Sequence, residues 1–108
     1  MSEQGVLLTA LPSREDARRL AAILVEEKLA ACVQLLPIES FYRWEGKVQN
    51  ESEVLLLIKT RTALFDAAMA RIKTEHPYSV PEIVGWPFSA GHLPYLDWID
   101  ESTLLGMP

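Results

Sequence analysis

Two long strand-forming segments joined by a tight turn constrain the fold of this chain more than any other feature. The first segment, AACVQLLPIESFYRW (residues 30–44), carries the β-branched and aromatic residues that strands favour. The second segment runs to about Thr60 and ends in EVLLLIKT. Between them, EGK (residues 45–47) predicts a tight turn in which Gly46 takes a positive φ. The hairpin would have arms of about 14 residues, roughly 45 Å each, which is longer than a domain of 108 residues needs.

The two halves of this hairpin differ in how they can be buried. EVLLLIKT is almost unbroken apolar sequence, which is typical of a central strand covered on both sides. KVQNESE, which precedes it, is polar and is expected to extend beyond the core. A proline within a strand belongs at a sheet edge or a bulge, so we expect the first arm to bend at Pro37. Exposed aromatic side chains at Phe41, Tyr42 and Trp44 favour a partner that covers this extension.

The remaining elements complete a recognised order of strands and helices. Ser13 is expected to cap a helix with Asp16 in its first turn, and Pro77 is expected to end a second helix. A short C-terminal helix starts near Pro94 and should turn Tyr95, Trp98, Ile99 and Ser102 inward. Further strands are predicted at 5–11 and 81–88, and helices at 13–29, 61–75 and 93–102. The order β-α-β-β-α-β predicts an α+β, ferredoxin-like sandwich with an antiparallel sheet, a long central hairpin and a C-terminal helix, as one domain over residues 1–108.

Charge and composition argue against several classes of function. Fifteen acidic residues against ten basic ones leave a net charge of −5, without the dense basic cluster that a nucleic-acid binder needs. No apolar run approaches the length of about 20 residues that spans a bilayer. The N-terminus lacks the basic start and long apolar run of a signal peptide, so we expect a soluble, cytoplasmic protein. No nucleophile, P-loop or dinucleotide motif is present, so we do not expect an enzyme.

Several motifs together resemble the CutA family of divalent-cation tolerance proteins. They are EKLAACVQLLPIESFYRWEGKV, SEVLLLIKT, HPYSVPEIVGWP and YLDWIDES, and they cover nearly the whole chain in the family's order. The resemblance implies a ferredoxin-like subunit, a homotrimer resembling that of PII signalling proteins, and a link to copper and other divalent cations. It does not imply an enzyme activity. Some bacterial relatives have histidine at the position of Glu75 and cysteine at that of Thr9, so this chain lacks two donors found there.

Four residues are the candidate metal ligands: His76, Glu75, Glu82 and Cys32. Imidazole and thiolate suit copper, and carboxylates bind divalent cations less selectively. No CxxC, HxH or HExxH spacing is present, so the site is expected to be shared between subunits. Three of these residues also have a structural interpretation: His76 could contact the last carbonyls of its helix, Cys32 could be a small buried residue, and Glu82 could pair with Lys59.

Two functions from different classes remain open at this point. The first is a trimeric metal-response protein that binds copper or another divalent cation at clefts between subunits, with the hairpin from Ser40 to Val54 pairing with a neighbour. The second is a PII-like signalling or scaffold trimer that binds a small anionic ligand or a protein partner. His92 is expected to be a solvated loop residue in either case.

Overall fold

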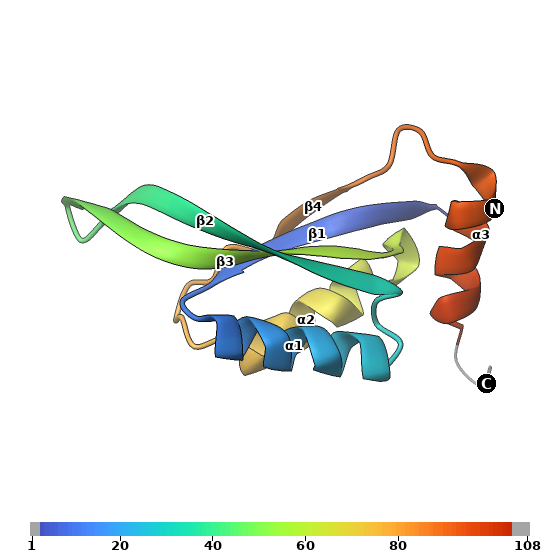
Figure 1. The fold of residues 1–108 in the computed structure, drawn as a ribbon, viewed down its shortest axis with the longest axis horizontal. Helices are drawn as coiled ribbons and strands as arrows, with labels where there is room; N and C mark the ends of the chain where they lie inside the picture. Colours follow the sequence, from blue (N-terminus) through green and yellow to red (C-terminus); the bar gives the residue numbers. More distant parts are fainter. Residues whose placement is uncertain (1–2, 105–108) are drawn as a thin grey trace.

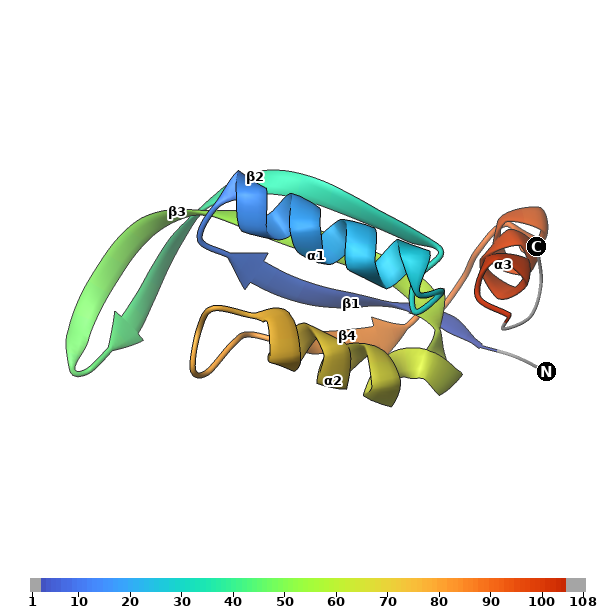
Figure 2. The same cartoon turned by 90° about the horizontal axis from the view of Figure 1, so that it is seen from below.

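The computed structural model describes residues 3–104, which form a four-stranded sheet with two helices on one face and a third at its end (Figures 1 and 2). The strand order is β2-β3-β1-β4, and every neighbouring pair is antiparallel. This arrangement confirms the ferredoxin-like α+β fold. The elements are β1 (Gln4–Leu11), α1 (Arg14–Glu26), β2 (Cys32–Trp44), β3 (Lys47–Arg61), η1 (Thr62–Leu64), α2 (Phe65–Glu75), β4 (Val84–Pro87) and α3 (Leu93–Ser102).

The predicted hairpin is formed by β2 and β3, and its tip extends well beyond the rest of the subunit (Figure 1). Glu45 and Gly46 both have positive φ, 51° and 78°, as a two-residue turn of this hand requires. Pro37 lies on the edge strand, as expected, but it pairs with Val54 in an unbroken register, so there is no bulge. An edge strand tolerates proline because only one of its sides has to donate hydrogen bonds to a neighbour.

The core lies between the sheet and helices α1 and α2. Alternate residues of the two central strands point at the helices, because side chains of a strand alternate between its faces. These residues are Leu7 and Leu11 of β1 and Leu56 and Ile58 of β3, and they pack against Leu20, Leu24, Ala68 and Ile72 of the helices. The core-facing residues of α1 therefore form one hydrophobic stripe. Leu29, which the predicted range 13–29 placed in the helix, lies beyond it and packs at the margin of the core.

Local signals set the helix ends where the sequence places them. Ser13 caps α1, and its hydroxyl accepts a hydrogen bond from the Asp16 amide at 3.1 Å. At the other end of the helical layer, α2 stops at Glu75 because His76, before Pro77, takes extended backbone angles. The extended residue redirects the chain across the sheet toward β4, which is shorter than predicted and covers only Val84–Pro87. Residues 77–82 thereby become a loop beside the hairpin.

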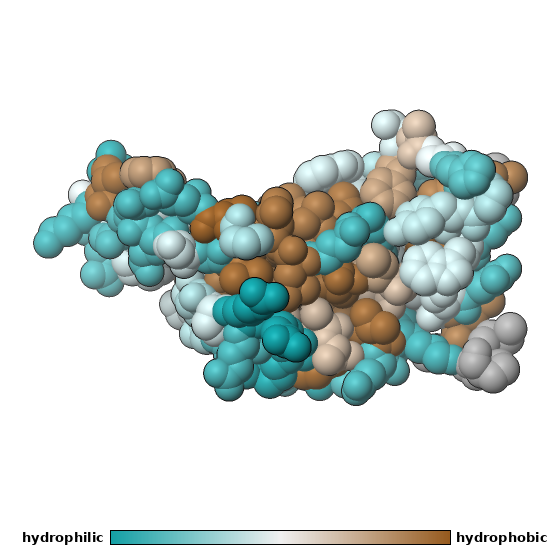
Figure 3. Space-filling model, viewed as in Figure 1, coloured by the Kyte–Doolittle hydropathy of each residue, from teal (hydrophilic) through white to brown (hydrophobic). Residues whose placement is uncertain are grey.

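The sheet face away from α1 and α2 is largely uncovered. Leu36 and Trp86 are about half exposed there, at 50% and 52%, and Val84 is similarly exposed. Figure 3 views the molecule from the β2 side, as Figure 1 does, and shows apolar surface in the middle of that side. Together with the half-buried Leu8, Leu55 and Leu57, which share this face by register, these side chains form the open apolar face.

Helix α3 packs only against one end of the sheet. Its contacts there include hydrogen bonds from Arg61 to the hydroxyl and carbonyl oxygens of Thr103, just beyond the helix, at 2.8 and 3.0 Å. The prediction that Tyr95, Trp98, Ile99 and Ser102 face inward is correct for Ile99, which is fully buried, while Ser102 is half-buried. Tyr95 and Trp98 are 37% and 43% exposed, because the helix lies at the end of the sheet and not over its face (Figure 1). Among the described helices, none is long and apolar enough to cross a membrane.

Candidate functional site

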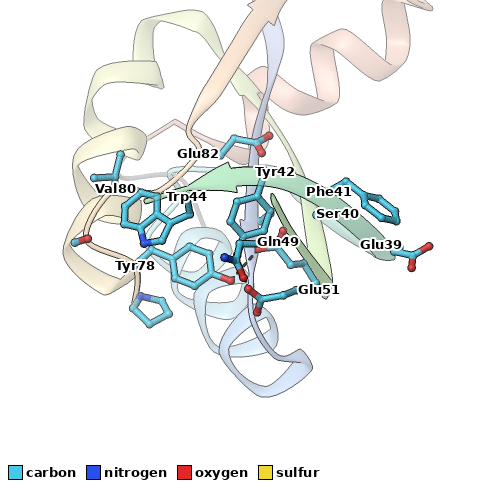
Figure 4. A pocket seen from close by; sticks show the side chains of 14 residues that line it. Glu39, Ser40, Phe41, Tyr42, Trp44, Gln49, Glu51, Tyr78, Val80 and Glu82 are labelled. Atoms are coloured by element: carbon cyan, nitrogen blue, oxygen red, sulfur yellow. Dashed lines mark hydrogen bonds between the residues drawn. The ribbon is translucent and has the colours of Figure 1, made fainter. Parts of the chain in front are cut away.

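A pocket of about 870 Å³ opens where the hairpin leaves the body of the sheet. One wall is the hairpin and the other is the loop 77–82 that follows α2 (Figure 4). Tyr42, Trp44, Gln49, Glu51 and Glu53 reach it from the hairpin. The register places these five side chains on the same face of β2 and β3. The pocket is lined by these residues and by Ala10, Glu39, Ser40, Phe41, Pro77, Tyr78, Ser79, Val80 and Glu82.

Two tyrosines donate hydrogen bonds to two carboxylates in this pocket. The Tyr42 hydroxyl donates to Glu51, and the Tyr78 hydroxyl donates to Oε2 of Glu53 at 2.8 Å. The bond to Glu51 raises the pKa of Tyr42, and burial followed by the bond to Glu53 raises the pKa of Tyr78. Both phenols therefore stay protonated at neutral pH and remain donors. The second bond ties the loop to the hairpin across the pocket.

His76 lies behind the loop wall and is 8% exposed. Its Nε2 lies 2.8 Å from the carbonyl oxygen of Ala10, which can only accept, so Nε2 carries the proton. The Nδ1 lone pair accepts a hydrogen bond from the Tyr78 amide at 3.2 Å. Both ring nitrogens are thus used within the chain. In this arrangement the imidazole fixes the backbone of Tyr78, and it could ligate a metal only after one of these bonds opens.

Burial gives His76 a pH-dependent contribution to stability. Desolvation lowers the pKa of His76 below its usual value of 6.5, although the Ala10 carbonyl and the charges of Glu53 and Asp16 act in the opposite direction. The unfolded chain therefore binds a proton at a pH where the folded chain does not, and the free energy of unfolding decreases as the pH falls below about 6.5.

Urea titrations between pH 7.5 and 5.5 test this expectation. The wild type should lose stability over this interval, while a His76→Asn variant, which cannot titrate, should lose measurably less. Equal slopes of stability against pH in the two proteins would contradict the assignment of the effect to His76.

The other candidate ligands do not meet at His76. Glu75 is engaged by Arg71 at 2.7 Å, and the same guanidinium forks to Glu27 at the end of α1, at 2.9 and 3.0 Å. Cys32 is half-buried at the start of β2, where it pairs with Lys59 in register. Within residues 3–104, no three His, Cys, Asp or Glu side chains are grouped so that they could hold a metal ion.

Of the four candidate ligands, Glu82 lines the pocket, where its side chain is exposed. His76, Glu75 and Cys32 are not among the described residues that line it. The hypothesis that it pairs with Lys59 is not supported among the described residues, whose ion pairs do not include this one. The Lys59 ammonium instead lies 5.6 Å from the ring centre of Tyr95 on α3.

Sequence reasoning missed the carboxylates that the pocket presents most directly. Glu51 and Glu53 belong to KVQNESE, whose polarity indicated only an extension beyond the core. A usable signal was present, because residues that pair across the hairpin share a face. The tight turn at Glu45 and Gly46 sets the register, which places Gln49 opposite Tyr42. Because alternate residues of a strand share a face, Glu51 and Glu53 lie on the same face as Gln49.

The fold and the pocket together define a class: small ferredoxin-like α+β domains with an overlong hairpin that carries an acidic, aromatic pocket at its base. The family model described as "CutA1 divalent ion tolerance protein" matches residues 5–102. The chain belongs to this CutA family, which confirms the resemblance seen in its motifs.

Individual relatives agree with this assignment. The divalent-cation tolerance protein CutA of Thermus thermophilus is 50% identical over 101 residues, covering 93% of this chain and 98% of the relative. The chloroplastic protein CutA 1 of rice is 48% identical over 91% of this chain, which spans only 56% of that longer relative. The solved structure of the periplasmic divalent cation tolerance protein CutA from Archaeoglobus fulgidus has a TM-score of 0.91 and 40% identity, and the match covers 94% of this chain and 99% of that chain.

Proposed function

We propose that the chain is a non-catalytic, cytoplasmic divalent-cation response protein that works as a homotrimer and binds cations at clefts between subunits. The observation that carries this proposal is the charge of the pocket. Glu39, Glu51, Glu53 and Glu82 line it, and no lysine, arginine or histidine among residues 3–104 does. Uncompensated carboxylates in a concave site create a negative potential that concentrates cations. This sign agrees with the divalent cation in the name of the Thermus thermophilus relative.

The same charge argues against the alternative of a PII-like trimer that binds a small anionic ligand at this position. An anion would enter a pocket without a basic side chain and would face four carboxylates. Repulsion between the anion and these carboxylates disfavours binding unless a counter-ion enters with the ligand. We therefore favour a divalent cation over a small anion as the ligand of this pocket. Binding of a protein partner remains the alternative function.

The donors available favour a cation that prefers oxygen ligands. Glu51, Glu53 and Glu82 supply carboxylate oxygens, which suit ions such as Mn²⁺ or Mg²⁺. Copper would draw on His76 and Cys32, with Glu75 as a further oxygen donor, but the structure keeps these groups apart and engages both nitrogens of His76. Copper binding at His76 thus requires the Tyr78 amide to release Nδ1. Cation binding by the carboxylates requires no change at His76.

A shared site follows from the number of donors that one chain provides. Described residues of a single subunit do not form a three-ligand group, so a neighbour has to complete the coordination. The open apolar face gives the subunit a reason to assemble, because exposed apolar area of this kind is typical of an interface between subunits. The projecting hairpin is the element that would reach the neighbouring copy.

Calorimetric titration of Mn²⁺ and Cu²⁺ into the assembled protein tests the proposal. Glu53→Gln keeps the acceptor for Tyr78 but removes one charge, so it should weaken Mn²⁺ binding about tenfold or more, the effect of losing a charge-assisted contact. Glu26→Gln removes the same charge from the exposed surface of α1 and serves as the matched control. Mn²⁺ binding that is equal in all three proteins, or absent from the wild type, would contradict the proposal.

A further inference from the structure

The pocket also presents aromatic rings, which a bare metal ion does not need. Tyr42 and Trp44 lie two positions apart on β2 and so share one face of the hairpin, and Tyr78 approaches them from the loop. Figure 4 shows the three rings grouped on one side of the pocket, with Gln49 and Glu51 beside them. Phe41, one position out of phase, points away from this group. The rings thus form a wall next to the carboxylates.

We propose that this pocket binds an alkylammonium ion, that is, a small organic cation with an apolar chain and a positively charged nitrogen. Such a cation is attracted to the faces of Trp44, Tyr42 and Tyr78 by the cation–π interaction, which is strongest for tryptophan. Its apolar chain gains further free energy from contact with the rings. Its charge is balanced by Glu51 and Glu53. A divalent metal ion uses oxygen ligands at close range and gains nothing comparable from the ring faces.

Hydrogen bonds hold the rings in a binding arrangement before a ligand arrives. The hydroxyls of Tyr42 and Tyr78 are directed at Glu51 and Glu53, and Tyr42 and Trp44 remain 37% and 46% exposed. The Tyr78 backbone is fixed in turn by His76, whose ring centre lies 5.0 Å from that of Tyr78. Each carboxylate accepts only one such bond and keeps lone pairs for an ammonium group. A preordered site loses less entropy on binding.

The size of the pocket also suits an organic ligand. Its volume of about 870 Å³ lies within the range of small-molecule sites and far exceeds that of one ion. This inference concerns the same pocket as the proposed function but does not depend on it, because the rings and carboxylates of one subunit are sufficient. Metal binding and alkylammonium binding can therefore fail separately.

Titration of n-butylammonium into the full-length, assembled protein tests the inference, with the indole N–H signal of Trp44 followed by NMR. The signal should shift in a saturable manner. Neutral n-butanol, which has the same number of heavy atoms, should bind about tenfold more weakly or not at all, since it lacks the charge that the rings and carboxylates recognise. Trp44→Leu should weaken n-butylammonium binding about tenfold, read from the chemical shifts of the 77–82 loop, because it removes the best cation–π partner.

A matched control and a second ring variant make each outcome decisive. Glu26→Gln removes a carboxylate outside the pocket and should leave n-butylammonium affinity unchanged. If Trp44→Leu does not retain the native circular dichroism spectrum, Trp44→Phe replaces it and should weaken binding by a smaller factor. The inference is overturned if n-butanol binds as tightly as n-butylammonium, if the ring variant that folds binds like the wild type, or if no saturable shift occurs. Loss of Mn²⁺ binding alone would overturn only the proposed function.

Discussion

A Leu36→Glu variant is expected to sediment as a single chain of 12.2 kDa. The wild type is expected to sediment at about three times that mass, as the proposed homotrimer requires. Leu36 lies on the edge strand β2, on the open apolar face, and half of its surface is exposed in the single chain. Its neighbours in register are Leu55 on β3 and Ala10 on β1. A carboxylate placed there would have to be buried without a partner on assembly, which costs far more than the interface gains at that position.

Val25→Glu is the matched control for this prediction. It makes the same change from an apolar to a charged side chain at a 42% exposed position, but on α1, on the opposite side of the sheet. This variant should sediment like the wild type. A Leu36→Glu protein with native circular dichroism and wild-type mass would show that the open apolar face is not an interface between copies, and a wild type that sediments as one chain would remove the homotrimer from the proposal.

A Leu56→Ala variant should lower the free energy of unfolding by about 3 kcal/mol, within the range seen for fully buried leucines. Leu56 is completely buried on the central strand β3, where it packs with the core beneath α1 and α2. Truncation removes its apolar contacts and leaves a cavity, because strands paired on both sides cannot move in to fill the space. Urea unfolding at one fixed chain concentration measures the effect and keeps the contribution of assembly constant.

Leu93→Ala provides the comparison for this experiment. Leu93 begins α3 and is 67% exposed, so the same truncation should change the unfolding free energy by about 0.5 kcal/mol or less, as for surface positions generally. If Leu56→Ala proved as mild as Leu93→Ala, the central strand would not be the core element described above. If both were severe, Leu93 would have to be buried by another copy.

The elements that follow from local chemistry were predictable from the sequence. Ser13 caps α1, Gly46 takes the positive φ of the hairpin turn, and Pro77 forces the extended backbone at His76 that ends α2. Each of these features depends on residues within four positions of one another. The apolar run EVLLLIKT likewise marked the central strand, because burial on both faces leaves no polar alternation.

The candidate site was less predictable, because its residues are far apart in the sequence. Predicting His76 as an important position was possible, but the sequence could not show that both of its ring nitrogens are used by Ala10 and Tyr78. Ala10 is 66 positions away, on another strand. The sequence pattern also predicted Tyr95 and Trp98 to face inward, but both are partly exposed because α3 lies at the end of the sheet and not over its face (Figure 1).

By itself, the sequence determined the order of the elements, the reach of the hairpin and the family to which the chain belongs, since periodicity, caps and turn residues act over short distances along the chain. Only the tertiary structure decided which groups share the pocket. It brought Glu53 and Tyr78 within 2.8 Å, across 25 positions, and it left Glu75 and Cys32 outside. The reason is that a pocket is made by side chains from separate elements, and their meeting depends on strand register and on the twist of the hairpin.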